Sequence, residues 1–291
     1  CAFRYPGRLL KSDDVIPDNV ARFLAAQLGL KPDDLLPYAA RKNTRHEHLT
    51  SMRKVYGYRM FKGKRAKQMR MWLDQNGETV PSSESLVRRF VEECRRRKII
   101  LPGLSVIERH CAIALVEAER RIETRIASRL NSSMRSDLNR LLIETADGRL
   151  SRFIWVRQFE LGKNSADMNR LLDRLEVLQG IILSPNILAD IPAHRVMRLR
   201  RQGERYFTDG LRDISSDRRL AILAVCVVEW AAAISDTIVD THDRIVGTVW
   251  RDAKKICDAQ IAAAQSDLDA TLAGFETLGS TLLMAQGDDI A

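Results

Sequence analysis

The chain has 291 residues, of which 45% are apolar, and a formal net charge of +9. This length predicts about two domains, and the apolar content is ample for buried cores. The cysteines are widely scattered without a CxxC motif, which argues against a disulfide framework or a zinc site and indicates a reducing compartment; they are Cys1, Cys94, Cys111, Cys226 and Cys257.

The longest apolar run is Leu220–Ile234, about fifteen residues interrupted by Glu229. It is too short to span a bilayer and predicts a buried helix, so no membrane partner is expected.

Positive charge is concentrated near the start of the chain. Residues 41–70 hold eleven Lys or Arg and one acid, Glu47. Residues 1–100 carry 22 basic and 11 acidic residues, whereas the remaining 191 carry 25 basic and 27 acidic ones. Phosphate backbones attract such charge by releasing condensed counterions. The pattern therefore predicts a basic nucleic-acid-binding module joined to a more neutral body.

Three short helices are expected at the start. Pro17 opens a helix that stops near Gly29, and Pro32 opens a second one at 33–39. Thr44 and Glu47 form a capping box before a third helix, which ends at Gly57. Its inward residues are expected to be Leu49, Met52, Val55 and Tyr56. This order is typical of a helix-turn-helix unit, although any small three-helix bundle with a solvated basic face gives the same pattern.

The third helix supplies the candidate DNA-binding residues. The face opposite its apolar side holds the residues expected to contact base edges, which are His46, Thr50, Ser51 and Lys54. Glu47 lies on the same face but is expected to act as the capping carboxylate. Flanking cations are expected to grip phosphates: Arg41, Lys42, Arg45, Arg53 and Arg59. The following helix, Lys62–Leu73, adds Lys62, Lys64 and Lys67 outside and places Ala66, Met69, Trp72 and Leu73 inside. The turn Asn76-Gly77 predicts a boundary.

A second helical unit is expected from Ser82 or Ser83. Its first helix buries Leu86, Phe90 and Cys94 and ends in the basic run 95–98, where cations suit the helix dipole. Ser105 and Glu108 form a second capping box that begins a long helix, about 105–130. Arg121, Arg125 and Arg129 recur along one side of it. They are candidates for DNA contact together with Ser105 and Arg109, but a surface stripe of ordinary salt bridges is equally compatible with them.

The fold class that follows is all-α, with tandem helix-turn-helix-like three-helix modules at 1–77 and 78–148 and a helical body at 149–291. Strand patterns are confined to Lys98–Leu101 and Phe153–Val156. Later helices are expected at 132–145, 165–179, 184–202, 216–238, 240–264 and 267–284. Residues 201–291 are expected to pack as architectural helices, and the aromatic residues Trp155, Trp230, Trp250 and Phe207 are expected in cores.

Enzymatic and metal chemistry has little support in the sequence. Asp236, Asp240 and Asp243 share a helix face beside His242 and could hold a divalent ion, but a polar helix face or a junction near Thr241 is the simpler interpretation. His46 and His48 lack HExxH spacing. No nucleophile motif stands out. We therefore expect no metal site, no cofactor and no catalytic residues in these 291 residues.

Three groups of residues resemble the N-terminal region of transposases of the Tn-three (Tn3) family, large bacterial enzymes that move transposons replicatively. The first group is Val15–Leu30 followed by Arg45, Leu49 and Tyr56-Gly57-Tyr58. The second is Leu101-Pro102-Gly103-Leu104-Ser105-x-x-Glu108-Arg109. The third is Asp217–Leu223 before Asp236 and Asp240. The resemblance covers nearly the whole chain, and the second group is its most specific part.

The resemblance implies sequence-specific binding of duplex DNA at the terminal inverted repeats of a transposon. It also implies a bacterial cytoplasmic, nucleoid-associated protein that self-associates at full length. Catalysis in that family lies in a later domain with metal-binding carboxylates, which is absent here, so the segment is expected to bind DNA but not to cut it. The chain lacks an initial methionine, which indicates a piece of a longer protein. The alternatives are a helical protein–protein scaffold or an RNA-binding module.

Overall fold

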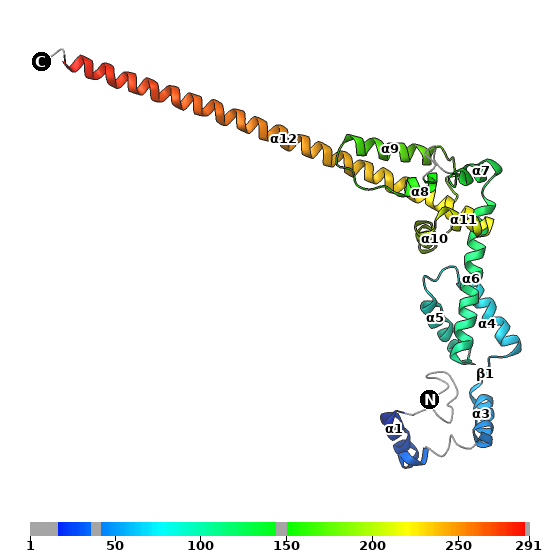
Figure 1. The fold of residues 1–291 in the computed structure, drawn as a ribbon. Coiled ribbons are helices and arrows are strands. Elements are labelled where there is room, and N and C mark those ends of the chain that lie inside the picture. The colour runs from blue at the N-terminus through cyan, green and yellow to red at the C-terminus, as the bar shows by residue number, and fades with distance from the viewer. Residues whose placement is uncertain (1–16, 36–41, 144–149, 289–291) are drawn as a thin grey trace. The chain divides into compact units, whose positions relative to one another are not determined.

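A computed structural model describes residues 17–35, 42–143 and 150–288 (Figure 1). These residues are overwhelmingly helical, so the predicted all-α class is confirmed. The chain divides into two compact units. Unit 1 contains residues 1–136 and 183–226, and unit 2 contains residues 137–182 and 227–291.

Unit 1 holds most of the elements. They are α1 (Asp18–Leu28), the 3-10 helix η1 (Pro32–Leu35), α3 (Lys42–Tyr56), β1 (Arg59–Met60), α4 (Gly63–Asn76), α5 (Ser83–Arg96), β2 (Ile99–Ile100), α6 (Leu104–Ser128), α10 (Ala193–Arg205) and α11 (Thr208–Asp213). Unit 2 holds α8 (Arg152–Arg157) and α9 (Ser165–Gln179). Helices α7 (Ser132–Arg140) and α12 (Ser216–Asp288) run from one unit into the other.

The core of unit 1 is made by α4, α5 and α6, which lie side by side (Figure 1). The apolar spacing of each helix puts one face inward, and the buried residues are Met69, Leu73, Val80, Leu86, Phe90, Cys94, Ile99, Ile107, Cys111 and Ala114. Ser82 begins α5 as predicted, since its hydroxyl accepts a hydrogen bond from the Ser85 backbone N–H at 3.1 Å. The predicted boundary at residue 77 therefore falls inside one shared core.

The strands β1 and β2, of two residues each, pair in parallel, with Arg59 opposite Ile99. The predicted strand pattern at 98–101 is thus confirmed. The one at Phe153–Val156 is wrong, because these residues form α8, whose N-cap Ser151 accepts a hydrogen bond from Ile154.

The first predicted three-helix unit departs from expectation. Helix α1 ends at Gly29, whose φ of 65° suits glycine, as predicted. The second helix is a short 3-10 turn at 32–35, and residues 36–41 lie outside the described part. Helix α3 begins at Lys42, before the predicted cap Thr44.

The expected inward face of α3 is also mostly wrong, because Leu49 is buried while Met52, Val55 and Tyr56 are exposed. Among described side chains between 17 and 57, only Ala25 and Leu49 are buried. Nothing described therefore covers the rest of that face.

Two further expectations fail at helix ends. The N-cap of α6 is Gly103, without a side-chain hydrogen bond, so Ser105 lies inside the helix and is not a cap. The three helices expected between 216 and 284 are one helix, α12, which passes through Thr241 without a junction. Helical periodicity cannot show where one helix stops when no strong breaker intervenes.

Unit 2 packs α8 and α9 on α12. Phe153 of α8 lies 5.0 Å from Trp230 of α12 between ring centroids. Thr241 is fully buried and its hydroxyl accepts a hydrogen bond from the Gly162 backbone N–H at 3.0 Å. The predicted core positions of Trp250 and Phe207 are wrong, since these side chains are exposed.

By length and composition, one described helix, within Ser216–Met284, could cross a membrane. Its most apolar residues, Leu220–Val227, Trp230 and Ile234, are buried in the fold, as a core helix requires.

Candidate nucleic-acid interface

A basic surface runs from α3 to α4. Its exposed cations are Lys54, Arg59, Lys62, Lys64, Arg65, Lys67 and Arg70, and Arg53 is half-buried beside them. We call these eight residues the basic surface. In the part of the chain that the structure describes, none of them forms an ion pair with a carboxylate. No carboxylate of the described residues therefore neutralises their charges, which suits contact with an anionic partner.

The core holds the basic surface in place. Met69 and Leu73 anchor the inner side of α4, so Lys64 and Lys67 face outward. The Arg59 backbone N–H donates to the Lys98 carbonyl at 2.8 Å, which ties the segment between α3 and α4 to β2. Phe61 packs edge-on against Phe90 with centroids 5.9 Å apart. These cations thus stand on a segment tied to the core of unit 1.

The start of α6 brings a further cation close to α4. Burial lowers the pKa of His110, and the charges of Arg70 and Arg109 lower it further. The His110 ring lies 5.8 Å from the Phe61 ring between centroids, so the start of α6 packs against the segment between β1 and α4. Arg109 and Ser105 are both exposed, as a DNA-contacting role requires.

The predicted base-reading face of α3 is accessible. His46, Thr50, Ser51 and Lys54 are exposed. The Thr50 hydroxyl donates to the His46 carbonyl at 3.0 Å, which leaves its oxygen lone pairs free to accept. Arg41 lies outside the described residues, as do the side chains of Lys42 and Arg45.

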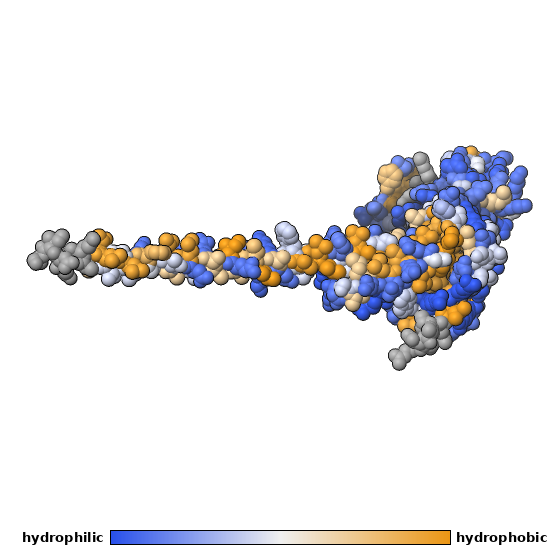
Figure 2. Space-filling view, turned by 90° about the horizontal axis from the view of Figure 1, so that it is seen from above, coloured by the Kyte–Doolittle hydropathy of each residue, from blue (hydrophilic) through white to orange (hydrophobic). Residues whose placement is uncertain are grey.

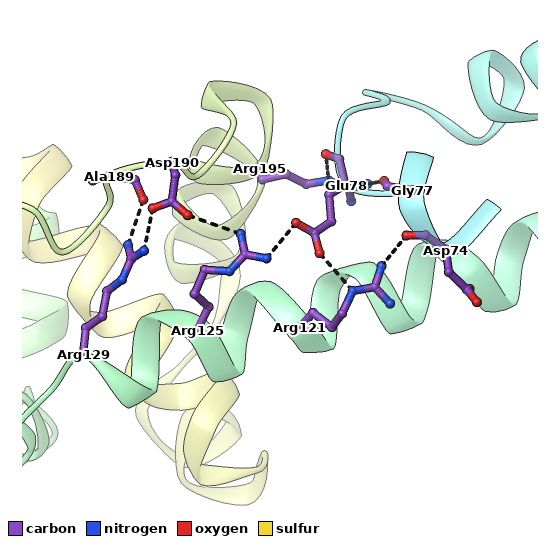
Figure 3. Close-up of polar contacts among 9 residues, drawn as sticks. All are labelled: Asp74, Gly77, Glu78, Arg121, Arg125, Arg129, Ala189, Asp190 and Arg195. Carbon is purple, nitrogen blue, oxygen red and sulfur yellow. Dashed lines mark hydrogen bonds and ion pairs between the residues drawn. The ribbon is translucent and has the colours of Figure 1, made fainter. Parts of the chain in front are cut away.

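The arginine stripe of α6 forms hydrogen bonds and ion pairs with other segments of unit 1 (Figure 3). Arg121 and Arg125 both donate to the Glu78 carboxylate at 2.9 Å. Arg129 donates to the carbonyls of Ile187 and Ala189 and pairs with Asp190. Of the two interpretations that the sequence left open, the structure supports salt bridges. These bridges are internal and join distant segments, rather than forming along one helix surface.

The pKa of Glu78 agrees with its part in these salt bridges. Burial alone would raise the pKa of Glu78, but hydrogen bonds from Arg121 and Arg125 and their charges outweigh it, so its pKa lies below the ordinary value. Glu78 stays ionised and neutralises both guanidinium groups. DNA contact by Arg121 or Arg125 would have to compete with this network.

Sequence reasoning missed Arg195, which is buried in unit 1. Its guanidinium donates to the carbonyls of Gly77, Glu78 and Val80, and so joins α10 to the turn between α4 and α5 (Figure 3). Burial lowers the pKa of Arg195, and the charge of Glu119 opposes that shift. The available signal was an arginine on the apolar face of a helix, next to Val196 and one turn before Leu199.

The proposed metal ligands do not form a cluster. Among the described residues, no three His, Cys, Asp or Glu side chains are grouped as metal ligands would be. Asp236, Asp240 and Asp243 follow one another along α12 and are exposed. The thiols of Cys94 and Cys111 are buried, and burial raises their pKa to about 12 and about 11. They are therefore unreactive core residues.

Comparison with known proteins finds similarity to transposases over nearly the whole chain. Residues 1–114 match a family model described as a domain of unknown function, DUF4158. The chain is 29% identical over 286 residues to the transposase for transposon Tn3926 of Escherichia coli and 28% identical to the transposase for transposon Tn21 of the same species. It is 29% identical to the transposase for transposon Tn501 of Pseudomonas aeruginosa. Each match covers 98% of this chain and 29% of the relative.

Proposed function

We propose that this chain, a homologue of Tn3-family transposases over nearly its whole length, binds duplex DNA at the terminal inverted repeats of a transposon. The chain spans about 29% of the length of these relatives. Their activity is therefore proposed for a longer protein, to which this segment would contribute DNA-end recognition without strand cleavage or joining. Such a protein would work in the bacterial cytoplasm in association with the nucleoid.

The observation that carries the proposal is the contrast between two sets of arginines and lysines. The α6 stripe is neutralised by Glu78 and Asp190, whereas no carboxylate among the described residues neutralises the basic surface. Unneutralised cations on a rigid helix release counterions when they meet a phosphate backbone, which provides affinity. A scaffold whose charge served only solubility would have no need to keep these cations separate from acids.

We propose different roles for the cations of the basic surface and for the exposed polar face of α3. The cations of α4, together with Arg59 and Lys62 in and after β1, would contact phosphates and fix the position of the protein along the duplex. The exposed polar side chains of α3, His46, Thr50, Ser51 and Lys54, are suited to base edges in the major groove. Ser105 and Arg109, both exposed at the start of α6, would add a second contact region.

Band-shift titration of the 291-residue chain tests the proposal, with duplexes that carry or lack the terminal repeat. Replacing Lys64 and Lys67 together by Gln should weaken binding to both duplexes by a similar factor. Each lost phosphate contact should also reduce the slope of log affinity against log salt by roughly 0.9. Lys54→Ala should instead reduce the preference for the repeat.

The matched control removes the same charge elsewhere. Arg88 and Arg120 are exposed and pair with Glu84 and Glu117 on their own helices. Replacing both by Gln should leave DNA affinity and the salt slope nearly unchanged. Equal losses in the two double variants would mean that net charge alone drives binding, and tighter binding of RNA duplexes of the same sequence would favour an RNA-binding module.

A further inference from the structure

Packing alone gives helix α3 little hold on the rest of unit 1. Among the side chains of α3 that the structure describes, Leu49 is the one that is buried. The helix ends at Tyr56, and Gly57 follows with a φ of 72°, a conformation that glycine adopts at no steric cost. The direction of α3 relative to the core of unit 1 therefore depends on the link formed by residues 57–62.

Lys98, which lies between α5 and β2, holds this link from both sides. Its Nζ donates a hydrogen bond to the Tyr56 carbonyl oxygen at 3.4 Å, across 42 residues of sequence. Its own carbonyl oxygen accepts a hydrogen bond from the Arg59 backbone N–H at 2.8 Å. One residue thus contacts the chain both before and after Gly57.

The Tyr56 carbonyl is a group that attracts a cation, because Tyr56 is the last residue of α3. The last four carbonyls of a helix have no partner within the helix, and they form the negative end of its dipole. An ammonium group at this end satisfies one of the oxygens and is attracted by the dipole. The Lys98 side chain is therefore a favourable partner for the end of α3, although it comes from a different segment.

The backbone of Lys98 indicates that its side chain has a role. Lys98 follows Arg97, the C-cap of α5, and has a φ of 52°. Glycine is the usual residue in this left-handed position after a helix, because a Cβ is strained there. Of the described residues other than glycine, only Lys98 and Asp190 have a positive φ. A lysine is therefore present here at a cost in backbone energy, which is typical of functional positions.

The direction of α3 matters for the function proposed above. Its exposed polar side chains, His46, Thr50, Ser51 and Lys54, are proposed to contact base edges, whereas the cations of α4 contact phosphates. Hydrogen bonds to base edges need a fixed helix direction in the groove, but attraction to phosphates tolerates more variation. A change in the direction of α3 should therefore affect sequence preference more than affinity.

We propose that Lys98 is a positioning residue, which fixes the direction of α3 against the core of unit 1 and thereby determines the preference of the chain for the terminal repeat. The inference rests on the proposed function, because it takes α3 as the helix that contacts bases. In this role Lys98 acts through α3 and not through its own charge.

Band-shift titration of three variants of the full chain tests the effect on preference. Lys98→Gly removes the ammonium group and suits the φ of this position, so it should not lower the midpoint temperature of unfolding. It should reduce the ratio of affinities for repeat and random duplexes by about three- to tenfold, the effect of one net hydrogen bond. Lys98→Met should reduce this ratio equally, whereas Lys98→Arg, which keeps a charged donor, should largely restore it.

Lys64→Gln is the matched control, because it removes one positive charge at a proposed phosphate contact. It should weaken binding to both duplexes alike and leave the ratio of their affinities unchanged. The same result for Lys98→Gly, with a reduced salt slope, would mean that Lys98 contacts phosphate instead of positioning α3, and would overturn the proposal.

Electron spin resonance measures the position of α3 without DNA. Spin labels on Ser51→Cys of α3 and Arg88→Cys of α5, both exposed positions, report one distance. The chain carries Ser in place of Cys1 and of the exposed Cys257. The distance distribution should be narrow with Lys98 and with Lys98→Arg, and clearly broader with Lys98→Gly. An equal width in all three would overturn the positioning role.

The exposed apolar part of α12 requires a precaution in this measurement. Figure 2 shows hydrophobic residues along this part of the helix, and Trp250 and Phe275 are among its exposed side chains. Exposed apolar surface of this extent can bring chains together. Labelled chain is therefore diluted with an excess of unlabelled chain, so that the measured distance lies within one chain.

The two experiments separate failure of this inference from failure of the proposed function. If the unmodified chain does not prefer the repeat, the proposed function is wrong, and the distance distribution still decides whether Lys98 holds α3. If the chain prefers the repeat and Lys98→Gly changes neither the ratio of affinities nor the width of the distribution, only the role of Lys98 is wrong.

Discussion

The Glu78 carboxylate accepts a hydrogen bond from Arg121 of α6 at 2.9 Å, across 43 residues of sequence. Its second oxygen accepts from Arg125 at the same distance. One acid in the turn between α4 and α5 thereby holds two arginines of a neighbouring helix. This arrangement neutralises Arg121 and Arg125 within unit 1.

Glu78→Gln should destabilise unit 1. The substitution removes the charge that neutralises Arg121 and Arg125, both partly shielded from solvent. Because the pairs are only partly buried, the expected loss is about 1–2 kcal/mol in the free energy of unfolding, below the cost of breaking a fully buried pair. Urea unfolding measures it. Glu84→Gln, whose pair with Arg88 is exposed, should change the free energy by less than about 0.5 kcal/mol.

Arg195→Met should also be destabilising, although it keeps much of the side-chain volume. It removes the donor to the carbonyls of Gly77, Glu78 and Val80. Hydrogen bonds to a charged group contribute roughly 1.5–3 kcal/mol, and an effect of about 2 kcal/mol is expected in urea unfolding. Arg198→Met, half exposed and paired with Glu119, is the control. An equal loss in both variants would contradict the structural role assigned to Arg195.

The stability of the α5 end should depend on pH through Glu93. Hydrogen bonds from Arg96 and Arg97 hold the pKa of this carboxyl at about 2, below its ordinary value of 4.5, although burial acts in the opposite direction. A lowered pKa means that the stabilisation is fully present above pH 4.5 and is lost as pH falls toward 2. The difference in unfolding free energy between the wild type and Glu93→Gln should therefore shrink over this interval. A difference that grows on acidification would contradict the assignment.

Gly162→Ala should destabilise unit 2 because an added Cβ has no space. It would lie 2.6 Å from Thr241 Cγ2 and 2.8 Å from Asp167 Cβ. Forcing extra atoms into such a site costs about 1–3 kcal/mol. Gly274→Ala, in the exposed part of α12 with nothing within 4 Å, should instead raise stability by up to roughly 1 kcal/mol through helix propensity. In thermal unfolding, Gly162→Ala should lower the midpoint temperature and Gly274→Ala should raise it.

The spacing of apolar and capping residues along the chain was sufficient to predict many of the helices. The bounds expected for α9 at 165–179 agree with the structure, and Ser82 caps α5 as predicted. The residues Ile107, Cys111, Ala118, Ile122 and Ile126 of α6 are buried, and their spacing of four or seven residues is that of one helix face. These features depend on residues three or four apart, which the sequence displays directly.

What the sequence determined by itself is the all-α class, the concentration of positive charge at 41–70 and the apolar faces of the central helices. Only the tertiary structure decided that Arg121, Arg125 and Arg129 are held by Glu78 and Asp190, that α4 shares a core with α5 and α6, and that Trp250 is exposed. A guanidinium group has the same charge and spacing whether it meets a phosphate or a distant carboxylate. Its partner is set by which segments the fold brings together, and periodicity along one helix carries no information about that.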